Sequence, residues 1–326
     1  MIITVTTVVV LVLGVLSLGL AMYGGYVSLS ITEGLEGNQE ERHAAEQRYY
    51  LLGMIGIIVL TTRLLNVPIF FWMLQSLVPH CPGAMCAYGV VNVAAPYSTI
   101  SIILKMFLPF AYGLWLVVEL ANRNQPELPF TRYLARSFLL ALFPLVLIDS
   151  AVDVGLVAMI RPIYAPCCSS AYDVNPPFSP SSIFGPEFGL LVIAITITVA
   201  LVLIIVQWFE GYSAKVPLLT GLLCCVVALL YLVAIHDAYA PFVLGLPTHH
   251  CPYCLFQEFP DTAFFSGLFW VGIAAAGWRI ILEAAWKRKG LPLDSIRPLS
   301  GFLLKASSVA ILFSMVSMVS HLLLVL

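Results

Sequence analysis

Residues 188–208 read FGLLVIAITITVALVLIIVQW, a stretch without a charged side chain. A helix needs about 20 consecutive apolar residues to cross the hydrocarbon core of a membrane. Strands of a membrane β-barrel would instead alternate apolar and polar residues over about ten positions, and this stretch shows no such alternation. It therefore predicts a transmembrane α-helix.

Similar apolar stretches recur along the rest of the chain. Of its 326 residues, 61% are hydrophobic and 10% are charged, and the mean hydropathy is +0.99. A soluble domain has about 25% charged residues, so this chain cannot cover itself with a hydrated surface. It has no basic tract, which argues against nucleic acid as a partner. We predict an all-α integral membrane protein with about eight transmembrane helices in the lipid bilayer, at residues 2–29, 51–78, 98–121, 137–160, 188–208, 216–240, 262–285 and 301–325.

The loops between these helices differ strongly in their content of Lys and Arg. If consecutive loops alternate between the two sides of the membrane, the loops on one side hold only Arg161. Basic loops face the cytoplasm, so we expect both termini to be extracytoplasmic, in the cytoplasmic membrane of a prokaryote. No basic residue precedes the first helix and no cleavage pattern follows it, so we expect a retained helix. The cytoplasmic loops would hold Arg42, Arg48, Arg123, Arg132, Arg136, Lys215, Lys287, Arg288, Lys289 and Arg297.

The cysteines are distributed unevenly on this topology. Cys224 and Cys225 fall within the sixth helix, where small buried apolar side chains are the expected role. The other six would lie in extracytoplasmic loops, where an oxidising compartment permits disulfides. Their connectivity cannot be read from the sequence. These six are Cys81, Cys86, Cys167, Cys168, Cys251 and Cys254.

Short motifs recur in the same order in the first and second parts of the chain. We therefore hypothesise two four-helix halves, residues 1–160 and 188–326, joined by an extracytoplasmic Pro/Ser-rich connector at 161–187. An even number of helices gives both halves the same orientation. The recurring motifs are Gly25-Tyr26 and Gly211-Tyr212, His80-Cys81-Pro82 and His250-Cys251-Pro252, Val117–Ala121 and Ile281–Ala285, Leu128-Pro129 and Leu291-Pro292, and Phe138–Leu140 and Phe302–Leu304.

The sharpest chemical signal is the pair Cys251-x-x-Cys254. Two intervening residues let both sulfurs meet at a helix start, where a reactive thiolate is favoured. The segment CPYCLFQ, residues 251–257, resembles the active-site segment of the DsbB family of membrane thiol oxidases, which pass electrons from a periplasmic dithiol to quinone. The resemblance implies a redox pair at Cys251 and Cys254. That family has four helices and a second cysteine pair in another outer loop, for which the candidates here are Cys81/Cys86 or Cys167/Cys168.

Histidines near the same loops suggest other ligands. His80, His249 and His250 adjoin the outer cysteines, and thiolate together with imidazole suits zinc or copper. His236 and His321 lie near the outer ends of the sixth and eighth helices. They could ligate a b-type haem or hydrogen-bond a quinone headgroup, or each could simply bond a backbone carbonyl at the membrane interface.

Four charged residues fall deep within the predicted helices: Arg63, Lys105, Asp149 and Asp153. Their depths suggest the pairs Arg63–Asp149 and Lys105–Asp153, because an unpaired charge within the membrane is costly. Such a cluster could form a proton or ion path, hold a bound polar group, or serve as a structural lock between helices.

Three functions remain open. The first is a membrane thiol–disulfide oxidoreductase coupled to quinone, with Cys251 and Cys254 exchanging and Cys81 and Cys86 as a relay pair. The second is a non-catalytic anchor for other membrane or extracytoplasmic subunits of an electron-transfer complex, with structural disulfides. The third is a transporter or metal-handling protein that uses the intramembrane charges and the outer Cys and His residues.

Overall fold

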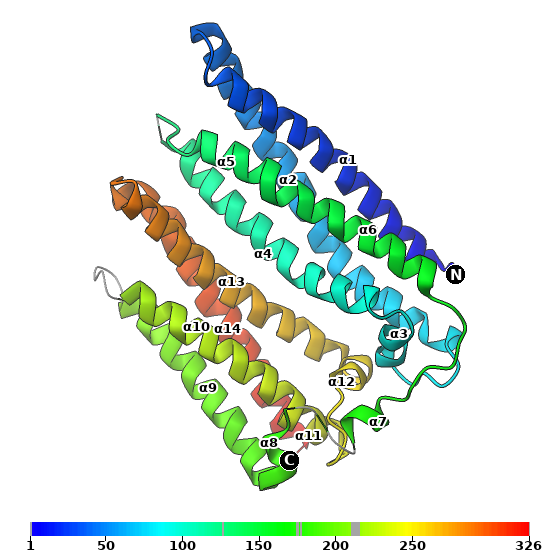
Figure 1. Ribbon diagram of the computed structural model, residues 1–326. Coiled ribbons are helices and arrows are strands. Elements are labelled where there is room, and N and C mark those ends of the chain that lie inside the picture. The colour runs from blue at the N-terminus through cyan, green and yellow to red at the C-terminus, as the bar shows by residue number, and fades with distance from the viewer. Residues whose placement is uncertain (1, 126, 174–175, 177, 210–215, 326) are drawn as a thin grey trace. The chain divides into compact units, whose positions relative to one another are not determined.

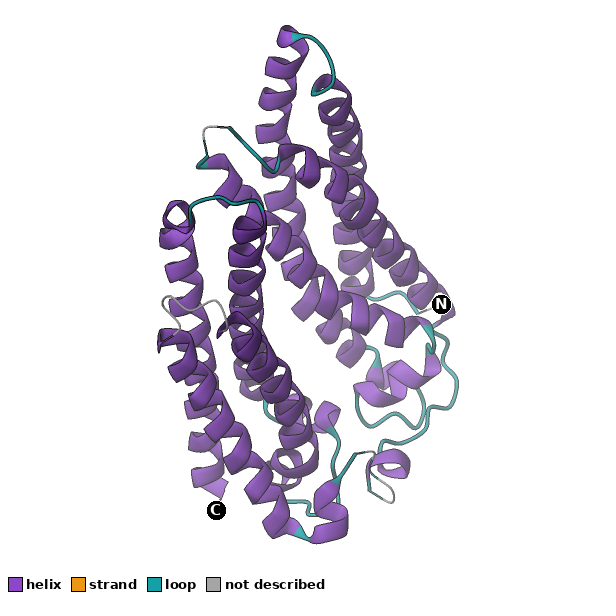
Figure 2. Ribbon diagram, turned by 60° about the vertical axis from the view of Figure 1, so that its left-hand side comes forward, coloured by secondary structure: helices purple, strands orange, loops and turns teal. Residues whose placement is uncertain are grey.

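The computed structural model describes residues 2–125, 127–173, 176, 178–209 and 216–325. These residues form helices, turns and loops, with no β-strand among them (Figure 2). Eight described segments are long and apolar enough to cross a membrane, which confirms the all-α membrane prediction. The segments are Val5–Gly34, Gln39–His80, Tyr97–Arg123, Thr131–Met159, Pro186–Phe209, Leu218–Leu244, Pro260–Arg288 and Leu293–Leu324.

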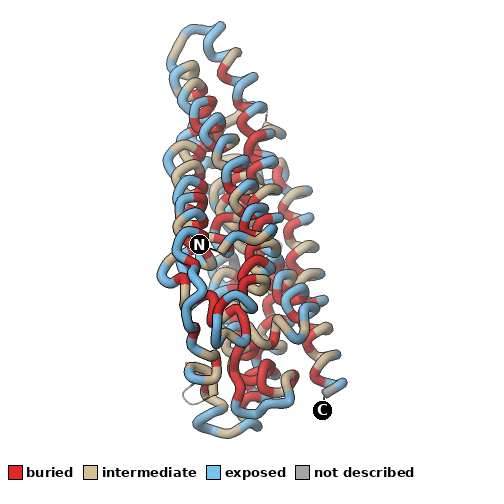
Figure 3. Tube along the Cα trace, turned by 90° about the vertical axis from the view of Figure 1, so that its right-hand side faces the viewer, coloured by how far each residue is buried: buried red, intermediate tan, exposed pale blue. Residues whose placement is uncertain are grey.

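Large apolar side chains on the outside of these helices show what surrounds them. Leu16, Leu229 and Val309 are 57%, 65% and 66% exposed. Along the chain, buried and exposed positions interchange through every long helix (Figure 3). A soluble protein does not leave so many large apolar side chains in water, so this surface faces lipid and the chain is an integral membrane protein.

The chain divides into two compact units, Met1–Ala165 and Pro166–Leu326. The hypothesis that residues 1–160 and 188–326 are repeats remains a prediction. Three residues of the sequence interpretation, Gly211, Tyr212 and Lys215, lie outside the described residues.

In the first unit, α1 packs along α2 and α6, and α4 packs against the same two helices (Figure 1). The buried faces of α2, α4 and α6 therefore meet, and the intramembrane charges lie on these faces. The elements of this unit are α1 (Val5–Gly34), α2 (Gln39–Ser76), η1 (Val78–His80), α3 (Ala87–Val93), α4 (Tyr97–Arg123), α5 (Thr131–Ser137), η2 (Phe138–Leu142) and α6 (Phe143–Met159).

The turn between α1 and α2 is shorter than predicted. The loop expected at 31–50 is mostly helix, because α1 continues to Gly34 and α2 already begins at Gln39. Asn38 caps α2: its side chain accepts a hydrogen bond from the backbone N–H of Glu41, whose own side chain accepts from the backbone N–H of Asn38. The polar residues from Glu33 to Arg48 therefore lie at the adjoining ends of two helices.

In the second unit, α9 packs on α10, and α13 packs on α14 (Figure 1). Its core is apolar and includes Tyr231 stacked on Phe269, with ring centroids 3.8 Å apart. The elements are α7 (Ser169–Tyr172), α8 (Pro180–Phe184), α9 (Pro186–Phe209), α10 (Val216–Val233), η3 (Ala234–Tyr239), α11 (Ala240–Leu244), α12 (Pro252–Glu258), α13 (Pro260–Arg288), η4 (Leu293–Ile296) and α14 (Arg297–Val325).

The sixth membrane segment contains a π-helical stretch, η3, between α10 and α11. Short π-helical stretches widen one turn of a helix and often occur at functional sites. This one carries His236, which contacts the loop just before Cys251, and Asp237, which contacts Ser181 in α8.

Candidate functional site

The Cys251-x-x-Cys254 pair lies at a helix start, as its spacing predicts. Cys251 has an extended backbone and directly precedes α12, and Cys254 is in the first turn of that helix. Cys251 is fully buried, and Cys254 is half-buried. Because α12 has only seven residues, its dipole adds little to the reactivity of either thiol. Any activation must come from neighbouring side chains.

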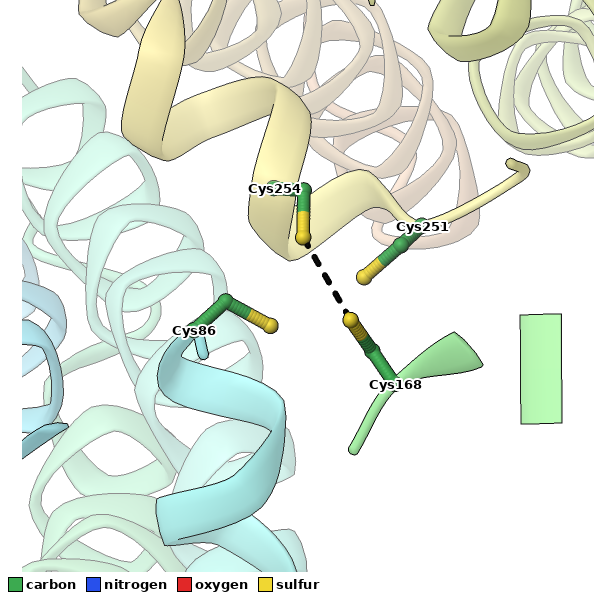
Figure 4. Close-up of side chains that lie close together, drawn as sticks. All are labelled: Cys86, Cys168, Cys251 and Cys254. Carbon is green, nitrogen blue, oxygen red and sulfur yellow. Dashed lines mark hydrogen bonds between the residues drawn. The ribbon is translucent and has the colours of Figure 1, made fainter. Parts of the chain in front are cut away.

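A third thiol completes this centre. Cys168 lies at the start of α7, and its Sγ is 3.5 Å from Sγ of Cys254. The sulfurs of Cys168, Cys251 and Cys254 all lie within 4.8 Å of one another and point toward a common point (Figure 4). A disulfide bond is about 2.05 Å long, so Cys168 and Cys254 are in non-bonded contact, close enough for one sulfur to attack the other.

An imidazole and a carboxylate stand behind Cys168. Nε2 of His249 is 4.0 Å from Sγ of Cys168, and Nδ1 of His249 is 2.5 Å from Oδ1 of Asp173. The carboxylate accepts the Nδ1–H, which leaves the Nε2 lone pair turned toward the thiol. A nucleophile beside a base that is oriented by a third group is the general arrangement for activating a thiol.

His250 has a different role from its neighbour. It is buried, with Nδ1 3.9 Å from a carboxylate oxygen of Asp237. Burial lowers the pKa of His250, and the nearby Asp237 only partly opposes this effect. Ser181 also donates to Asp237, from its Oγ at 2.7 Å and from its backbone N–H. Asp237 therefore ties the Pro/Ser-rich connector and the His249-His250 loop to η3.

The predicted haem or quinone histidines bond to protein groups. His236 Nδ1–H donates to the backbone carbonyl of His250 at 2.6 Å. Nδ1 of His321 is 2.9 Å from the hydroxyl of Tyr239, and its Nε2 is 2.6 Å from a carboxylate oxygen of Asp261. Both ring nitrogens of His321 are therefore engaged, and the haem interpretation gains no support from this arrangement.

Cys81 and Cys86, the relay pair expected from the sequence, have surroundings that favour a thiolate less than those of Cys168. Cys81 is buried, and burial raises the pKa of its thiol, which disfavours the reactive thiolate. Cys86 directly precedes α3 and is also buried, whereas His80 is exposed. Cys168 is thus better suited than Cys81 to exchange with the Cys251/Cys254 pair.

The thiol centre also has the donor set of a metal site. Two sulfurs bound to one tetrahedral zinc ion at ~2.3 Å would be about 3.8 Å apart, close to the 3.5 Å between Cys168 and Cys254. Asp173 contacts His249 in the way that carboxylates orient the histidine ligands of metals, through the ring nitrogen that does not bind the ion. Of the histidines predicted as ligands, His249 is therefore the better placed, since His250 faces Asp237.

The intramembrane charges form one connected cluster. Both ion pairs predicted from helix depth are present, Arg63–Asp149 and Lys105–Asp153. Lys105 also contacts Asp149, with Nζ 2.7 Å from the carboxylate, so the two pairs are joined. All four side chains are at most 1% exposed. Ser101 and Ser150, which the sequence interpretation did not include, hydrogen-bond to Asp153 and Arg63 at 2.6 Å.

Comparison with known proteins gives no relatives: no protein-family model, curated protein or solved structure matches this chain. The function must therefore be argued from the geometry of these two clusters.

Proposed function

We propose that this chain is a membrane thiol–disulfide oxidoreductase. Cys251 and Cys254 form the exchanging pair, and Cys168 is the third, activated thiol. One observation supports this best: Sγ of Cys168 is in contact with Sγ of Cys254 and has His249 and Asp173 behind it. A structural disulfide has no need for a base beside one of its sulfurs.

The exchange is balanced in both electrons and protons. His249 accepts the proton of Cys168, and the thiolate attacks Sγ of Cys254 in the Cys251–Cys254 disulfide. A Cys168–Cys254 bond forms, and Cys251 leaves as a thiolate. An extracytoplasmic dithiol then reduces this disulfide and becomes oxidised itself. Cys251 then takes the proton from His249, and a lipid-soluble quinone takes two electrons and two protons from the thiols of Cys251 and Cys254, which restores the Cys251–Cys254 disulfide and yields quinol.

A second function shares the same residues. Three thiols within 4.8 Å of one another suit a thiophilic ion such as Zn²⁺ or Cu⁺. A protein that binds such an ion here would hold or deliver metal, and its thiols would not turn over as a disulfide.

The redox state of the cysteines distinguishes these functions. We expect the thiol of Cys168 to be alkylated without reduction and those of Cys251 and Cys254 to become available at roughly −200 mV, whereas structural disulfides resist reduction down to about −300 mV. The measurement is mass-spectrometric mapping of alkylated cysteines in the full-length protein across a graded reduction series. Resistance of every bridge until denaturation would indicate a structural role. Protection by one equivalent of copurified metal would indicate the second function.

The carboxylate behind His249 gives a sharper prediction. With Asp173→Asn, Cys168 should react with iodoacetamide about tenfold more slowly at neutral pH, because the imidazole loses the carboxylate that orients it toward the thiol. The matched control is Asp261→Asn, which removes the carboxylate beside another histidine, His321, and should leave the rate unchanged. Equal rates for wild type and Asp173→Asn would remove Asp173 from the mechanism.

A further inference from the structure

The buried face of α4 carries polar side chains along its whole length. They recur at intervals of three and four residues, with Leu108 and Trp115 at the remaining positions. From Ser98 to Asn122 the helix rises ~36 Å at ~1.5 Å per residue, more than the ~30 Å of the hydrocarbon core. The polar side chains of this face are Ser98, Ser101, Lys105, Tyr112, Glu119 and Asn122.

The other unit shows that packing does not require such a face. An offset of 164 residues, the separation of Glu119 and Glu283, carries the central part of the buried face of α4, from Ser98 to Tyr112, onto buried positions of α13. Farther along, Trp115 and Glu119 correspond to Arg279 and Glu283, which are partly exposed. At this offset Lys105 corresponds to Phe269, and Tyr112 corresponds to Ala276. Small residues are the usual choice where helices pack within a membrane, and Phe269 packs in the apolar core of its unit without any charge. The charges on α4 therefore call for a role beyond packing.

At the centre of this face, hydrogen bonds form a continuous chain. Ser101 donates to Asp153, Lys105 donates to both Asp153 and Asp149, and Arg63 donates to Asp149. The titratable groups facing the two carboxylates are Arg63 from α2 and Lys105 from α4. The buried residues of α1, which also packs on α6, include no titratable side chain. The two cations and two anions give the cluster a net charge of zero. A proton added to either carboxylate would give it a net positive charge.

Spare hydrogen-bonding capacity lies beside the cluster. Among the described residues, no partner is found for Nε of Arg63 or for either amide atom of Asn66, which is fully buried. Asn66 lies one helical turn from Arg63 and one turn from Phe70, whose ring centroid is 5.1 Å from Nζ of Lys105. The amide is therefore on the face of α2 that meets the charges. These groups leave hydrogen-bonding positions open beside the two carboxylates.

The polar groups continue toward the basic end of α4. Glu119 is buried and pairs with Arg123, and its Oε2 has no partner within the described part of the chain. The amide of Asn122 donates to the hydroxyl of Tyr49 at 2.9 Å. Tyr112, between Glu119 and the central cluster in sequence, donates to the carbonyl of Leu142 at 3.4 Å. Acceptors and exchangeable protons therefore recur every two helical turns, or about 10 Å, between Lys105 and Glu119.

We propose that the first unit contains a proton-transfer path along the buried face of α4, with Asp149 and Asp153 as its central carriers. A proton arriving at either carboxylate forms an O–H bond, neutralises that carboxylate and weakens its ion pair with Lys105. That O–H bond breaks when the proton passes to the next acceptor. This path is a further function, and it does not depend on the thiol chemistry of the second unit.

The test is proton flux in liposomes that contain the full-length protein. A potassium gradient with valinomycin drives the flux, and an internal pH dye reports it. We expect wild type to acidify the vesicles faster than protein-free liposomes do. The double variant Arg63→Gln/Asp149→Asn removes one carrier but leaves no unpaired charge, and its flux should fall about a hundredfold, the scale of a positioned proton-transfer group.

The matched control is Glu283→Gln in α13, which removes a carboxylate paired with Arg279 in the other unit and should conduct like wild type. Thermal unfolding of the same preparations shows whether the double variant is folded. If it does not fold, Lys105→Gln/Asp153→Asn is used in its place; it removes the other carrier and leaves Arg63 paired with Asp149, and the same loss is expected. The proposal is overturned if wild type conducts no faster than empty liposomes, or if a folded variant conducts as wild type does.

Discussion

Replacing Cys254 with serine is expected to abolish thiol oxidation by this protein while leaving its fold intact. Sγ of Cys254 contacts Sγ of Cys168, and in the proposed reaction it takes part in both disulfides. A serine hydroxyl of similar size cannot form either bond. Removing one member of a catalytic unit costs about as much as removing the whole unit, so the rate of thiol oxidation should fall by roughly three orders of magnitude or more. The assay follows oxidation of a peptide dithiol by the purified protein with a soluble quinone.

Cys225→Ser is the control for this loss. Cys224 is buried as predicted, whereas the same prediction for Cys225 is wrong, because this side chain lies on the exposed face of α10. Cys225 is within a membrane segment and away from the loops that carry the thiol centre, so its removal should leave turnover unchanged. Unchanged turnover in Cys254→Ser would instead show that the pair is not redox-active. The thiol centre would then be assigned to metal or to structure.

The hydropathy of the sequence predicted all eight membrane segments, because lipid requires about 20 apolar residues wherever the chain crosses. The ends of the first two helices were wrong for a related reason. Hydropathy detects only the apolar part of a helix. The helix α1 continues past that part to Gly34, and α2 begins before its apolar part, at Gln39. The signal for this continuation was the capping pair Asn38 and Glu41.

The thiol centre was only half predictable. Cys251 and Cys254 are close in sequence, so their meeting at a helix start follows from local geometry. Asp173 is 76 residues from His249 in a loop without periodicity, and no local pattern indicates that the two meet. The same is true of Cys168, for which the sequence offered only its place in an outer loop. Tertiary folding of the connector brings these groups together.

Helix depth predicted the ion pairs within the membrane because position along a helix fixes depth at ~1.5 Å per residue. Depth alone assigns one partner to each charge. The contact of Lys105 with both Asp149 and Asp153 was missed, since it depends on how α4 and α6 are rotated toward each other. Because Asp149 contacts both Arg63 and Lys105, its replacement should affect stability more than replacement of any of the other three residues.

Asp149→Asn should lower the free energy of unfolding by about 3–5 kcal/mol, the usual cost of removing one partner from a buried ion pair. Asp149 is fully buried and accepts hydrogen bonds from both Arg63 and Lys105. Lys105 retains Asp153, but Arg63 keeps only neutral partners, the hydroxyl of Ser150 and the carbonyl of Val146. An uncompensated guanidinium then remains within the membrane. Thermal unfolding in detergent, together with the yield of monodisperse protein, measures the loss.

Adding Arg63→Gln to Asp149→Asn should restore part of this stability, since it removes the cation left without a counter-charge. Restoration should be partial because Lys105 still lacks one of its two carboxylates. The control is Glu36→Gln, which breaks an ion pair with Arg132 whose side chains are 62% and 51% exposed, and it should cost less than about 1 kcal/mol. If the double variant is no more stable than Asp149→Asn, the guanidinium is not what destabilises the single variant. The destabilisation must then come from Lys105 and its altered contact with Asp153.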